Sequence, residues 1–304
     1  VEAVAGSTIP HSWHEAASTL IELEEGTAVV IGGVDAGKSS LCTFLANFLV
    51  REGKRAAIVD ADIGQTDMGP PTTMAAADMT NPVTSLSLIE PSERLFVGYT
   101  SPGHIKGKVI RGVRKLANCH TKPGTLVVVN TDGWVTGDEA TAYKVQMLDE
   151  LKPSLVLGIG SSTDISEILQ TGSRAALLVG SADTIKERSR VDRRELRALG
   201  YQKYLTGSSV KTFRLDGVKL LESASGDDLD MRHLRWSEAE ELKDSIVGLL
   251  DQNDFLQEIG VLRKIMPSTR TVKILCRGGN VPREIEVGAV KLNREFRELT
   301  YVEG

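Results

Sequence analysis

The sequence predicts an α/β fold with a doubly wound, mostly parallel sheet, followed by a smaller mixed α/β C-terminal region. Five apolar runs of four or five residues recur before residue 180, and each is followed by Gly, Asp or Asn. Their hydrophobicity is continuous rather than alternating, which is typical of parallel strands buried on both faces. Helix-like stretches between such runs indicate a doubly wound sheet. The expected strands are residues 28–31, 56–59, 126–129, 155–159 and 175–179.

The segments around these strands complete the expected architecture. Residues 11–24 predict an amphipathic helix before the first strand, and residues 39–52 and 138–151 predict crossover helices. After about residue 206 the pattern changes to short strands at 212–215, 272–275 and 284–287 around a helix at 237–250. We therefore expect a helical lead-in (1–27), a main domain (28–207) and a small C-terminal domain (208–304).

The composition excludes several classes of protein. The chain has 304 residues, 36 Lys and Arg against 41 Asp and Glu, and 41% hydrophobic residues, which is the mix of a globular protein rather than a disordered or fibrous one. No apolar run approaches the roughly 18 residues that a membrane helix needs, so no membrane partner is expected. Cys42, Cys119 and Cys276 are odd in number and widely spaced. They predict no disulfide framework and favour a reducing, cytoplasmic setting.

The charge is unevenly distributed along the chain. The formal charge is −5, yet residues 94–122 contain seven basic residues and no acidic one. Residues 183–214 contain nine basic residues against four acidic ones. Such segments can bind a polyanion, and the alternative is two solvated helix faces.

The first expected strand leads into G-G-V-D-A-G-K-S, which fits the phosphate-loop pattern G-x-x-x-x-G-K-[ST] and precedes a helix-like stretch. In this motif, backbone N–H groups and the helix N-terminus bind phosphate, the Lys reaches the β- and γ-phosphates, and the Ser hydroxyl ligates Mg²⁺. The alternative is a chance glycine-rich turn. The motif predicts a P-loop NTPase that binds its nucleotide through Gly32, Gly33, Val34, Asp35, Ala36, Gly37, Lys38, Ser39 and Ser40.

Absent motifs narrow the class of nucleotide-binding protein. No N-K-x-D sequence follows the later strands, since the nearest string, Asn130-Thr131-Asp132-Gly133, lacks the Lys. A guanine-specific switch protein is therefore not expected. The chain also lacks an apolar run ending in Asp-Glu and an ABC-type signature loop.

The second expected strand ends in D-A-D-I-G-Q, residues 60–65. The carboxyl end of this strand should lie beside the phosphate loop, because ligands of parallel sheets bind at that edge. A carboxylate there can hold the Mg²⁺ shell or accept a proton from an attacking hydroxyl, and Gln65 can hydrogen-bond a nucleophile or a phosphate. The alternative is a pair of solvated turn aspartates.

Together, these motifs resemble the polynucleotide 5′-hydroxyl kinases: the RNA kinases of tRNA splicing, mRNA 3′-end formation and ribosomal RNA processing, and their prokaryotic relatives. Residues 130–134, N-T-D-G-W, are similar to the family's T-x-G-W clasp, and residues 188–194, running on to Tyr204, are similar to its arginine lid (about 183–204). Residues 96–102 resemble the loop between the acidic motif and the clasp. The resemblance covers residues 28–207 and identifies them as a P-loop kinase domain.

The resemblance implies ATP as phosphate donor, Mg²⁺ as its metal, and the 5′-hydroxyl end of RNA or DNA as acceptor. Asp60 is the expected base and, with Ser39, a metal ligand, while Asp62 belongs to the outer surroundings of the metal. Lys38, Arg188 and Arg193 complete the expected catalytic set. The two arginines lie about 140° apart on a helix, so a bend or a helix start is expected between them. The expected substrate contacts are Asp62, Gln65, Thr100, His104, Lys106, Lys108, Thr131, Gly133 and Trp134.

Three alternatives remain. Trp134 either stacks on the acceptor strand or caps the edge of the sheet. The protein is either an active kinase or a catalytically silent ATP-binding subunit of an RNA-processing assembly, and the lid arginines and the phosphate-loop Lys argue against silence. A small-metabolite kinase would not need the acid-free basic segment. The C-terminal region shows no chemical motif, and RNA-processing proteins are its expected partners.

Overall fold

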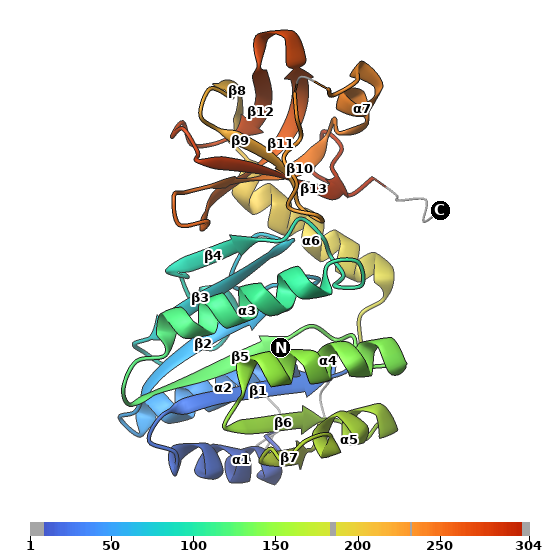
Figure 1. Cartoon of the computed structure of the whole chain (residues 1–304). Coiled ribbons are helices and arrows are strands. Elements are labelled where there is room, and N and C mark those ends of the chain that lie inside the picture. Colours follow the sequence, from blue (N-terminus) through green and yellow to red (C-terminus); the bar gives the residue numbers. More distant parts are fainter. Residues whose placement is uncertain (1–8, 183–186, 232, 300–304) are drawn as a thin grey trace.

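A seven-stranded sheet forms the first half of the molecule (Figure 1). The computed structural model describes residues 9–182, 187–231 and 233–299. Five strands are parallel to their neighbours in the order β2-β5-β1-β6-β7: β1 (Gly26–Gly32), β2 (Arg55–Ala61), β5 (Thr125–Thr131), β6 (Leu155–Ile159) and β7 (Ala176–Val179). The antiparallel β3 (Thr73–Met79) and β4 (Glu93–Phe96) extend the sheet beyond β2. The predicted, mostly parallel sheet is confirmed.

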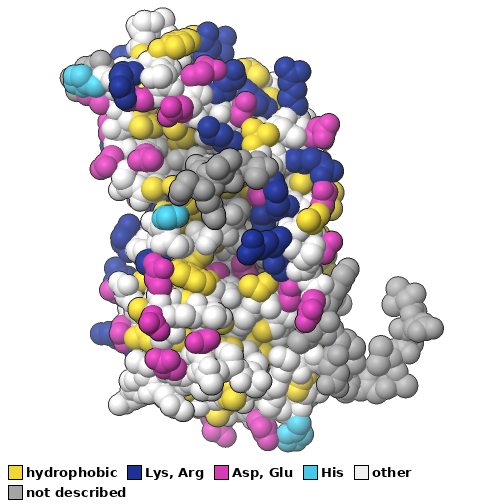
Figure 2. Space-filling model, turned by 90° about the vertical axis from the view of Figure 1, so that its right-hand side faces the viewer, with side chains coloured by type: hydrophobic (Ala, Val, Ile, Leu, Met, Phe, Trp, Pro, Cys, Tyr) yellow, Lys and Arg dark blue, Asp and Glu magenta, His cyan; other side chains and the backbone are white. Residues whose placement is uncertain are grey.

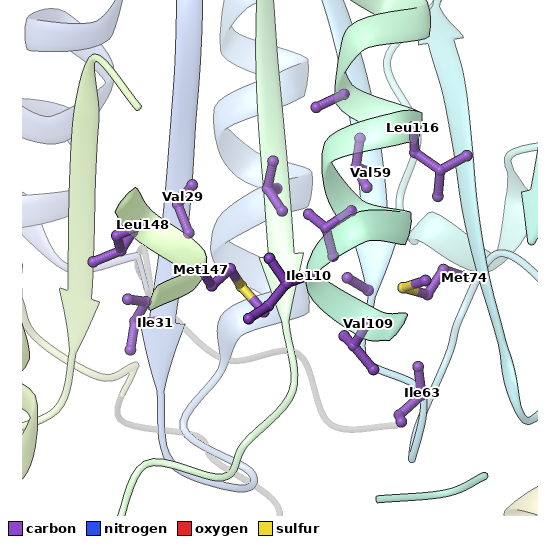
Figure 3. Close-up of a cluster of buried hydrophobic side chains, with 14 of the residues drawn as sticks. Val29, Ile31, Val59, Ile63, Met74, Val109, Ile110, Leu116, Met147 and Leu148 are labelled. Atoms are coloured by element: carbon purple, nitrogen blue, oxygen red, sulfur yellow. The ribbon is translucent and has the colours of Figure 1, made fainter. Parts of the chain in front are cut away.

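Helices cover both faces of this sheet. α1 (His11–Ile21) and α2 (Lys38–Arg51) pack on one face, and α3 (Lys106–His120), α4 (Asp138–Leu151) and α5 (Thr163–Gln170) pack on the other. Val29 and Ile31 of β1 lie beside Met147 and Leu148 of α4 (Figure 3), whereas Ala28 and Val30 belong to the core on the side of α1 and α2. Each strand is therefore buried on both sides, which explains its continuous apolar sequence.

A long helix, α6 (Arg190–Leu205), crosses from the first sheet to the second (Figure 1). Its N-cap is Ser189, whose hydroxyl accepts a hydrogen bond from the backbone N–H of Asp192, while the Asp192 carboxylate accepts one from the N–H of Ser189. This capping box fixes the start of the helix between the two lid arginines. The predicted helix start is confirmed, and residues 183–186 of the expected lid lie outside the described residues.

The second sheet has six strands in the order β8-β12-β11-β10-β13-β9. Its strands are antiparallel except for the pair β13 and β9. The strands are β8 (Ser209–Arg214), β9 (Lys219–Glu222), β10 (Ser245–Leu250), β11 (Leu256–Met266), β12 (Thr271–Cys276) and β13 (Glu284–Lys291). The predicted mixed α/β C-terminal region is confirmed at this level.

The predicted helix at 237–250 is wrong in its second half. The helix α7 (Trp236–Glu241) ends early, and residues 245–250 form the fully buried strand β10. Pairing with β11 and β13 on either side outweighs the local helical pattern of this short apolar run.

The two sheets share a common core. Phe96 of β4, Tyr201 and Leu205 of α6, and Ile246 of β10 belong to one buried cluster. At Gly98, with φ of 79°, a Cβ atom would lie 2.7 Å from the Cα of Gly288. Only glycine permits this close approach, so the backbones of the two halves touch directly.

No helix of the described residues is both long and apolar enough to span a bilayer. Cys42, Cys119 and Cys276 are free thiols, and burial raises the pKa of the Cys276 thiol to about 11. The exposed one is Cys119. These thiols therefore form no cross-link that stabilises the fold.

Candidate active site

The phosphate loop connects β1 to α2. Gly37 precedes α2 with φ of 98°, a left-handed conformation that favours glycine. At Gly32 a Cβ atom would lie 2.9 Å from the carbonyl oxygen of Ile159. The Lys38 side chain is buried and folds back over the loop, with Nζ donating to the Gly33 carbonyl at 2.8 Å. The loop thus curls at a helix N-terminus, the arrangement that binds phosphate.

Both lid arginines meet the phosphate loop at Asp35. The Asp35 carboxylate accepts a hydrogen bond from the backbone N–H of Arg188 at 2.9 Å and pairs with its guanidinium at 3.4 Å. Arg193 Nη1 lies 3.2 Å from the same carboxylate. The fold therefore places two guanidinium groups over the loop, where they can contact the terminal phosphates of a bound nucleotide.

The two aspartates of the acidic motif have different surroundings. Asp60 is fully buried, and its carboxylate accepts hydrogen bonds from the backbone N–H groups of Asp67 at 2.7 Å and Met68 at 3.2 Å, and from the Asn130 amide at 3.0 Å. It does not line the cavity described below. Asp62 lines that cavity, and its carboxylate accepts the N–H of Gln65 at 3.0 Å. Asp60 thus shapes the loop, and Asp62 faces the open space.

Burial raises the pKa of both carboxyl groups to about 6. At Asp60 the neighbouring charge of Asp67 raises the pKa further. At Asp62 the charge of Lys38 opposes the effect of burial, and the charge of Asp132 adds to it. A carboxyl group with this pKa can accept a proton near neutral pH.

Oxygen groups suited to Mg²⁺ surround Ser39. Burial raises the pKa of Asp67, and a hydrogen bond with the Ser39 hydroxyl opposes that shift. Asn130 Nδ2 lies 3.4 Å from Ser39 Oγ, while Asn130 Oδ1 is buried without a hydrogen-bond partner in the described part of the chain. The Ser39 hydroxyl and the Asp67 carboxylate line the cavity and fit Mg²⁺, which prefers oxygen ligands and usually keeps several waters. Within the described ranges, no cluster of three His, Cys, Asp or Glu could hold a metal alone.

A buried network holds the clasp. The Asp132 carboxylate accepts a hydrogen bond from Tyr143 Oη at 2.9 Å and lies 3.0 Å from Lys144 Nζ, which is fully buried. Asp132 also accepts the backbone N–H of Trp134 at 3.0 Å, and the Trp134 ring stacks on Tyr143 with centroids 5.6 Å apart. Thr131 is buried and donates to the Val30 carbonyl at 2.8 Å, outside the cavity lining.

One cavity of about 1610 Å³ joins these parts. Its walls include the phosphate loop, the acidic loop, the clasp and the lid. Gln65 hydrogen-bonds the Gly64 carbonyl at 2.6 Å and lies 3.5 Å from the Arg193 carbonyl, so it links the acidic loop to the lid. The predicted site residues that line the cavity are Val34, Asp35, Ala36, Gly37, Lys38, Ser39, Ser40, Asp62, Gln65, Thr100, Gly133, Trp134, Arg188 and Arg193.

The predicted contacts at the start of α3 lie outside the cavity lining. Lys106 forms an ion pair with Glu139, and its Nζ lies 5.9 Å from the centre of the Trp134 ring. Lys108 faces the second sheet, where it pairs with Glu286 and donates to Ser223 Oγ at 2.6 Å. His104 is exposed on the turn before the helix.

Six of the seven basic side chains in the acid-free segment form ion pairs with acidic residues from outside it. Arg114 pairs with Glu150 at 2.6 Å, and Lys122 pairs with Asp78 at 3.0 Å. On the face shown in Figure 2, basic side chains extend from the upper part of the molecule, which holds the second sheet, down to its middle, and few lie on the lower part. The segment therefore matches the alternative of a solvated helix face more closely than that of a continuous polyanion track.

Sequence reasoning missed four polar side chains of the site: Asn130, Asp67, Asp132 and the basic partner Lys144. Asp67 follows the acidic motif by two residues. It is the third carboxylate after the same strand, and this pattern is visible in the sequence. Asn130 ends a buried strand next to the phosphate loop, which is also a recognisable position. The Lys144 contact depends on the packing of α4 and has no sequence signal.

The comparisons with known proteins agree with this geometry. The family model described as mRNA cleavage and polyadenylation factor CLP1 P-loop matches residues 32–207. A polyribonucleotide 5′-hydroxyl-kinase of Pyrococcus horikoshii is 26% identical, with 96% of this chain and 93% of that protein covered. A protein of the same name from Thermococcus kodakarensis is 29% identical, with 90% of each covered.

A solved structure, that of the wild-type Clp1p–Pcf11p complex, has a similar fold. The TM-score is 0.70 at 13% sequence identity, and the match covers 93% of this chain and 80% of that one. The likeness therefore extends through the second sheet as well as the first.

Proposed function

Because the chain belongs to the CLP1 P-loop family, we propose that it is an ATP-dependent polynucleotide 5′-hydroxyl kinase. It transfers the γ-phosphate of ATP to the 5′-hydroxyl end of RNA or DNA. The names of relatives that match over nine-tenths of the chain support this activity. The observation that carries it is the cavity in which the phosphate loop, two guanidinium groups and the carboxylate of Asp62 meet.

In this proposal Asp62, rather than Asp60, is the base. A base must reach the proton that it accepts, and only Asp62 of the pair lines the cavity. The 5′-oxygen attacks the γ-phosphorus, its proton passes to the Asp62 carboxylate, and ADP leaves. Asp60 acts on the reaction indirectly, because its hydrogen bonds to Asp67 and Met68 fix the loop that carries Asp62.

The donor is held by groups around Lys38. The loop N–H groups and Lys38 bind the β- and γ-phosphates, and Arg188 and Arg193 turn from Asp35 toward the transferring group. When bound, Mg²⁺ supplies charge neutralisation at the phosphates. Ser39 and Asp67 would hold it, and Asp60 supports this site through the Asn130 amide, which donates to the Asp60 carboxylate and lies 3.4 Å from Ser39 Oγ.

The acceptor end lies on the clasp side of the cavity. Thr100, Gly133 and Trp134 line that side, next to Asp62. Trp134 is half-buried on Tyr143, so it offers a fixed aromatic edge to the terminal nucleotide.

We assign RNA-processing proteins as partners of the second sheet. The free thiols support a reducing, cytoplasmic setting.

The test is transfer from γ-labelled ATP to three acceptors: a 5′-hydroxyl oligonucleotide, the same oligonucleotide with a 5′-phosphate, and a nucleoside. We expect label only on the first, and none with the Lys38→Ala variant. Label on the nucleoside alone would point to a small-metabolite kinase. ATP binding without label on any acceptor would point to a silent subunit.

A further inference from the structure

The cavity extends beyond the phosphate loop along the outer face of α2. This arm runs between α2 and the N-terminal helix α1, and no step of the proposed phosphoryl transfer uses it. The residues that line it are Trp13, His14, Ser40, Thr43, Phe44, Asn47 and Phe48.

Aromatic rings form the wall of this arm. The ring of Phe44 lies 5.0 Å from that of His14, at an angle of 81°, and 5.9 Å from that of Trp13. Trp13 is buried, and its Nε1 donates to the Gly180 carbonyl at 2.8 Å, which ties α1 to the end of β7. Phe44 is half-buried and His14 is exposed, so the wall is anchored on one side and open on the other.

This aromatic wall lies within reach of a nucleotide whose phosphates occupy the loop. Ser40 and Phe44 share one face of α2 because they are four residues apart, and the helix rises about 6 Å between them. Ser40 lies in the first turn, beside Lys38 and Ser39. Ala182, after β7, and Arg188 line the cavity on the lid side. When the phosphates occupy the loop, the nucleoside part of the nucleotide therefore lies in the arm, between the lid and the aromatic wall.

The side chains of the arm favour stacking on a base over base-specific hydrogen bonds. The amide of Asn47 is engaged with Val83, donating to its carbonyl at 2.6 Å and accepting its N–H at 2.8 Å. The Trp13 N–H is engaged with Gly180. The exposed ring of His14 and the half-buried ring of Phe44 remain for a flat ligand, and aromatic rings of this kind stack on nucleic-acid bases.

We propose that Phe44 and His14, supported by Trp13, form the seat for the base of the donor nucleotide. The inference rests on the proposed function only in requiring a triphosphate on the phosphate loop. It gives the N-terminal helix a role in donor binding, separate from the acceptor side at Trp134.

The test compares two ligands by calorimetry in the presence of Mg²⁺: the ATP analogue AMP-PNP and inorganic tripolyphosphate, which has no base. Phe44→Leu keeps an apolar side chain, and His14→Ala changes an exposed residue. We expect each to weaken AMP-PNP binding about fivefold or more, with tripolyphosphate binding within about twofold of wild type. His11→Ala, which changes an exposed residue of α1 outside the cavity lining, is the matched control and should change neither value. Thermal melts establish that each variant is folded.

The proposed base seat would be wrong if the variants bound AMP-PNP and tripolyphosphate with equally reduced affinity. It would also be wrong if Phe44→Leu and His14→Ala bound AMP-PNP as tightly as wild type. The same conclusion would follow if wild-type protein bound AMP-PNP no more tightly than tripolyphosphate. Transfer to an oligonucleotide does not enter this comparison, so a failed kinase assay would leave the result interpretable.

Discussion

At the scale of single residues, the two aspartates of the acidic motif have separate roles. We predict that Asp62→Asn lowers transfer at least about 100-fold, because the amide cannot accept the proton. AMP-PNP binding should persist, since the phosphate loop is untouched. Single-turnover kinetics measures the transfer rate, and calorimetry measures AMP-PNP binding.

Asp60→Asn provides the comparison. Its single side-chain oxygen cannot accept every bond that the Asp60 carboxylate accepts, so the free energy of unfolding should fall by about 1–3 kcal/mol. Denaturant titration measures this loss. A stable Asp60→Asn protein without activity, beside a fully active Asp62→Asn protein, would reverse the assignment.

The pKa of Asp62 predicts the acid limb of the rate profile. The ionised carboxylate is the active base, and its pKa is raised to about 6. Below that pH the group is protonated, so kcat/KM should fall about tenfold per pH unit, and it should level off above pH 7. The Asp60→Asn variant should keep an acid limb but move it to lower pH, because the charge of Asp60 helps to raise the pKa of Asp62. A flat profile between pH 5 and pH 8 would contradict the role of Asp62.

Asp35 is an acidic residue in a loop that binds anions, and its contacts with Arg188 and Arg193 explain its presence. We predict that Asp35→Ala lowers kcat about tenfold, because the guanidinium groups lose their position. Affinity for AMP-PNP should not fall, since a negative charge near the phosphates is removed. Steady-state kinetics with Asp35→Asn as the intermediate case tests this, and an unchanged kcat in Asp35→Ala would refute it.

At the scale of elements, the C-terminal end of the chain holds the lid helix. Arg197 of α6 makes two bonds to the Glu298 carboxylate, at 2.6 and 2.7 Å, and Arg194 donates to the Glu298 carbonyl at 2.8 Å. Arg197 Nη1 also lies 3.5 Å from the Gly64 carbonyl. The segment after β13 thereby connects to the lid helix, and Arg197 joins that segment to the acidic loop.

We predict that Glu298→Gln increases hydrogen exchange in α6 and lowers kcat several-fold, because one charge-assisted pair to the lid is lost. Glu295→Gln, whose partner Arg297 lies on the exposed surface, is the control and should change neither quantity. Wild-type exchange across residues 190–205 in Glu298→Gln would show that the lid does not depend on this contact.

The elements also show how far the sequence predicts the fold. The five parallel strands were predictable because burial on both faces leaves an apolar run. The phosphate loop, acidic motif and clasp are local patterns, so they too were predictable. The strand β10 was predicted as part of a helix, since its partners β11 and β13 lie elsewhere in the chain. The contacts of Asp35 with the lid and of Lys144 with Asp132 require tertiary packing, which no spacing reveals.

At the scale of the whole molecule, Lys108 joins the two sheets. Its burial lowers the pKa of the amine, against the opposing charge of Glu286. We predict that Lys108→Met lowers the free energy of unfolding by roughly 1–3 kcal/mol, because it leaves the Glu286 carboxylate unpaired. The KM for the oligonucleotide should be unchanged. Lys122→Met, on an exposed pair, is the control. A raised KM with unchanged stability would restore Lys108 as an acceptor contact.

The central claim is that the cavity brings the acceptor's 5′-oxygen to Asp62 while Lys38 holds the donor. The most direct measurement is a crystal structure of the complex with AMP-PNP, Mg²⁺ and a short 5′-hydroxyl oligonucleotide. We predict that the 5′-oxygen lies about 2.6–3.2 Å from an Asp62 carboxylate oxygen, in line with the γ-phosphorus. A 5′-end bound away from Asp62, with the analogue seated on the loop, would contradict the mechanism.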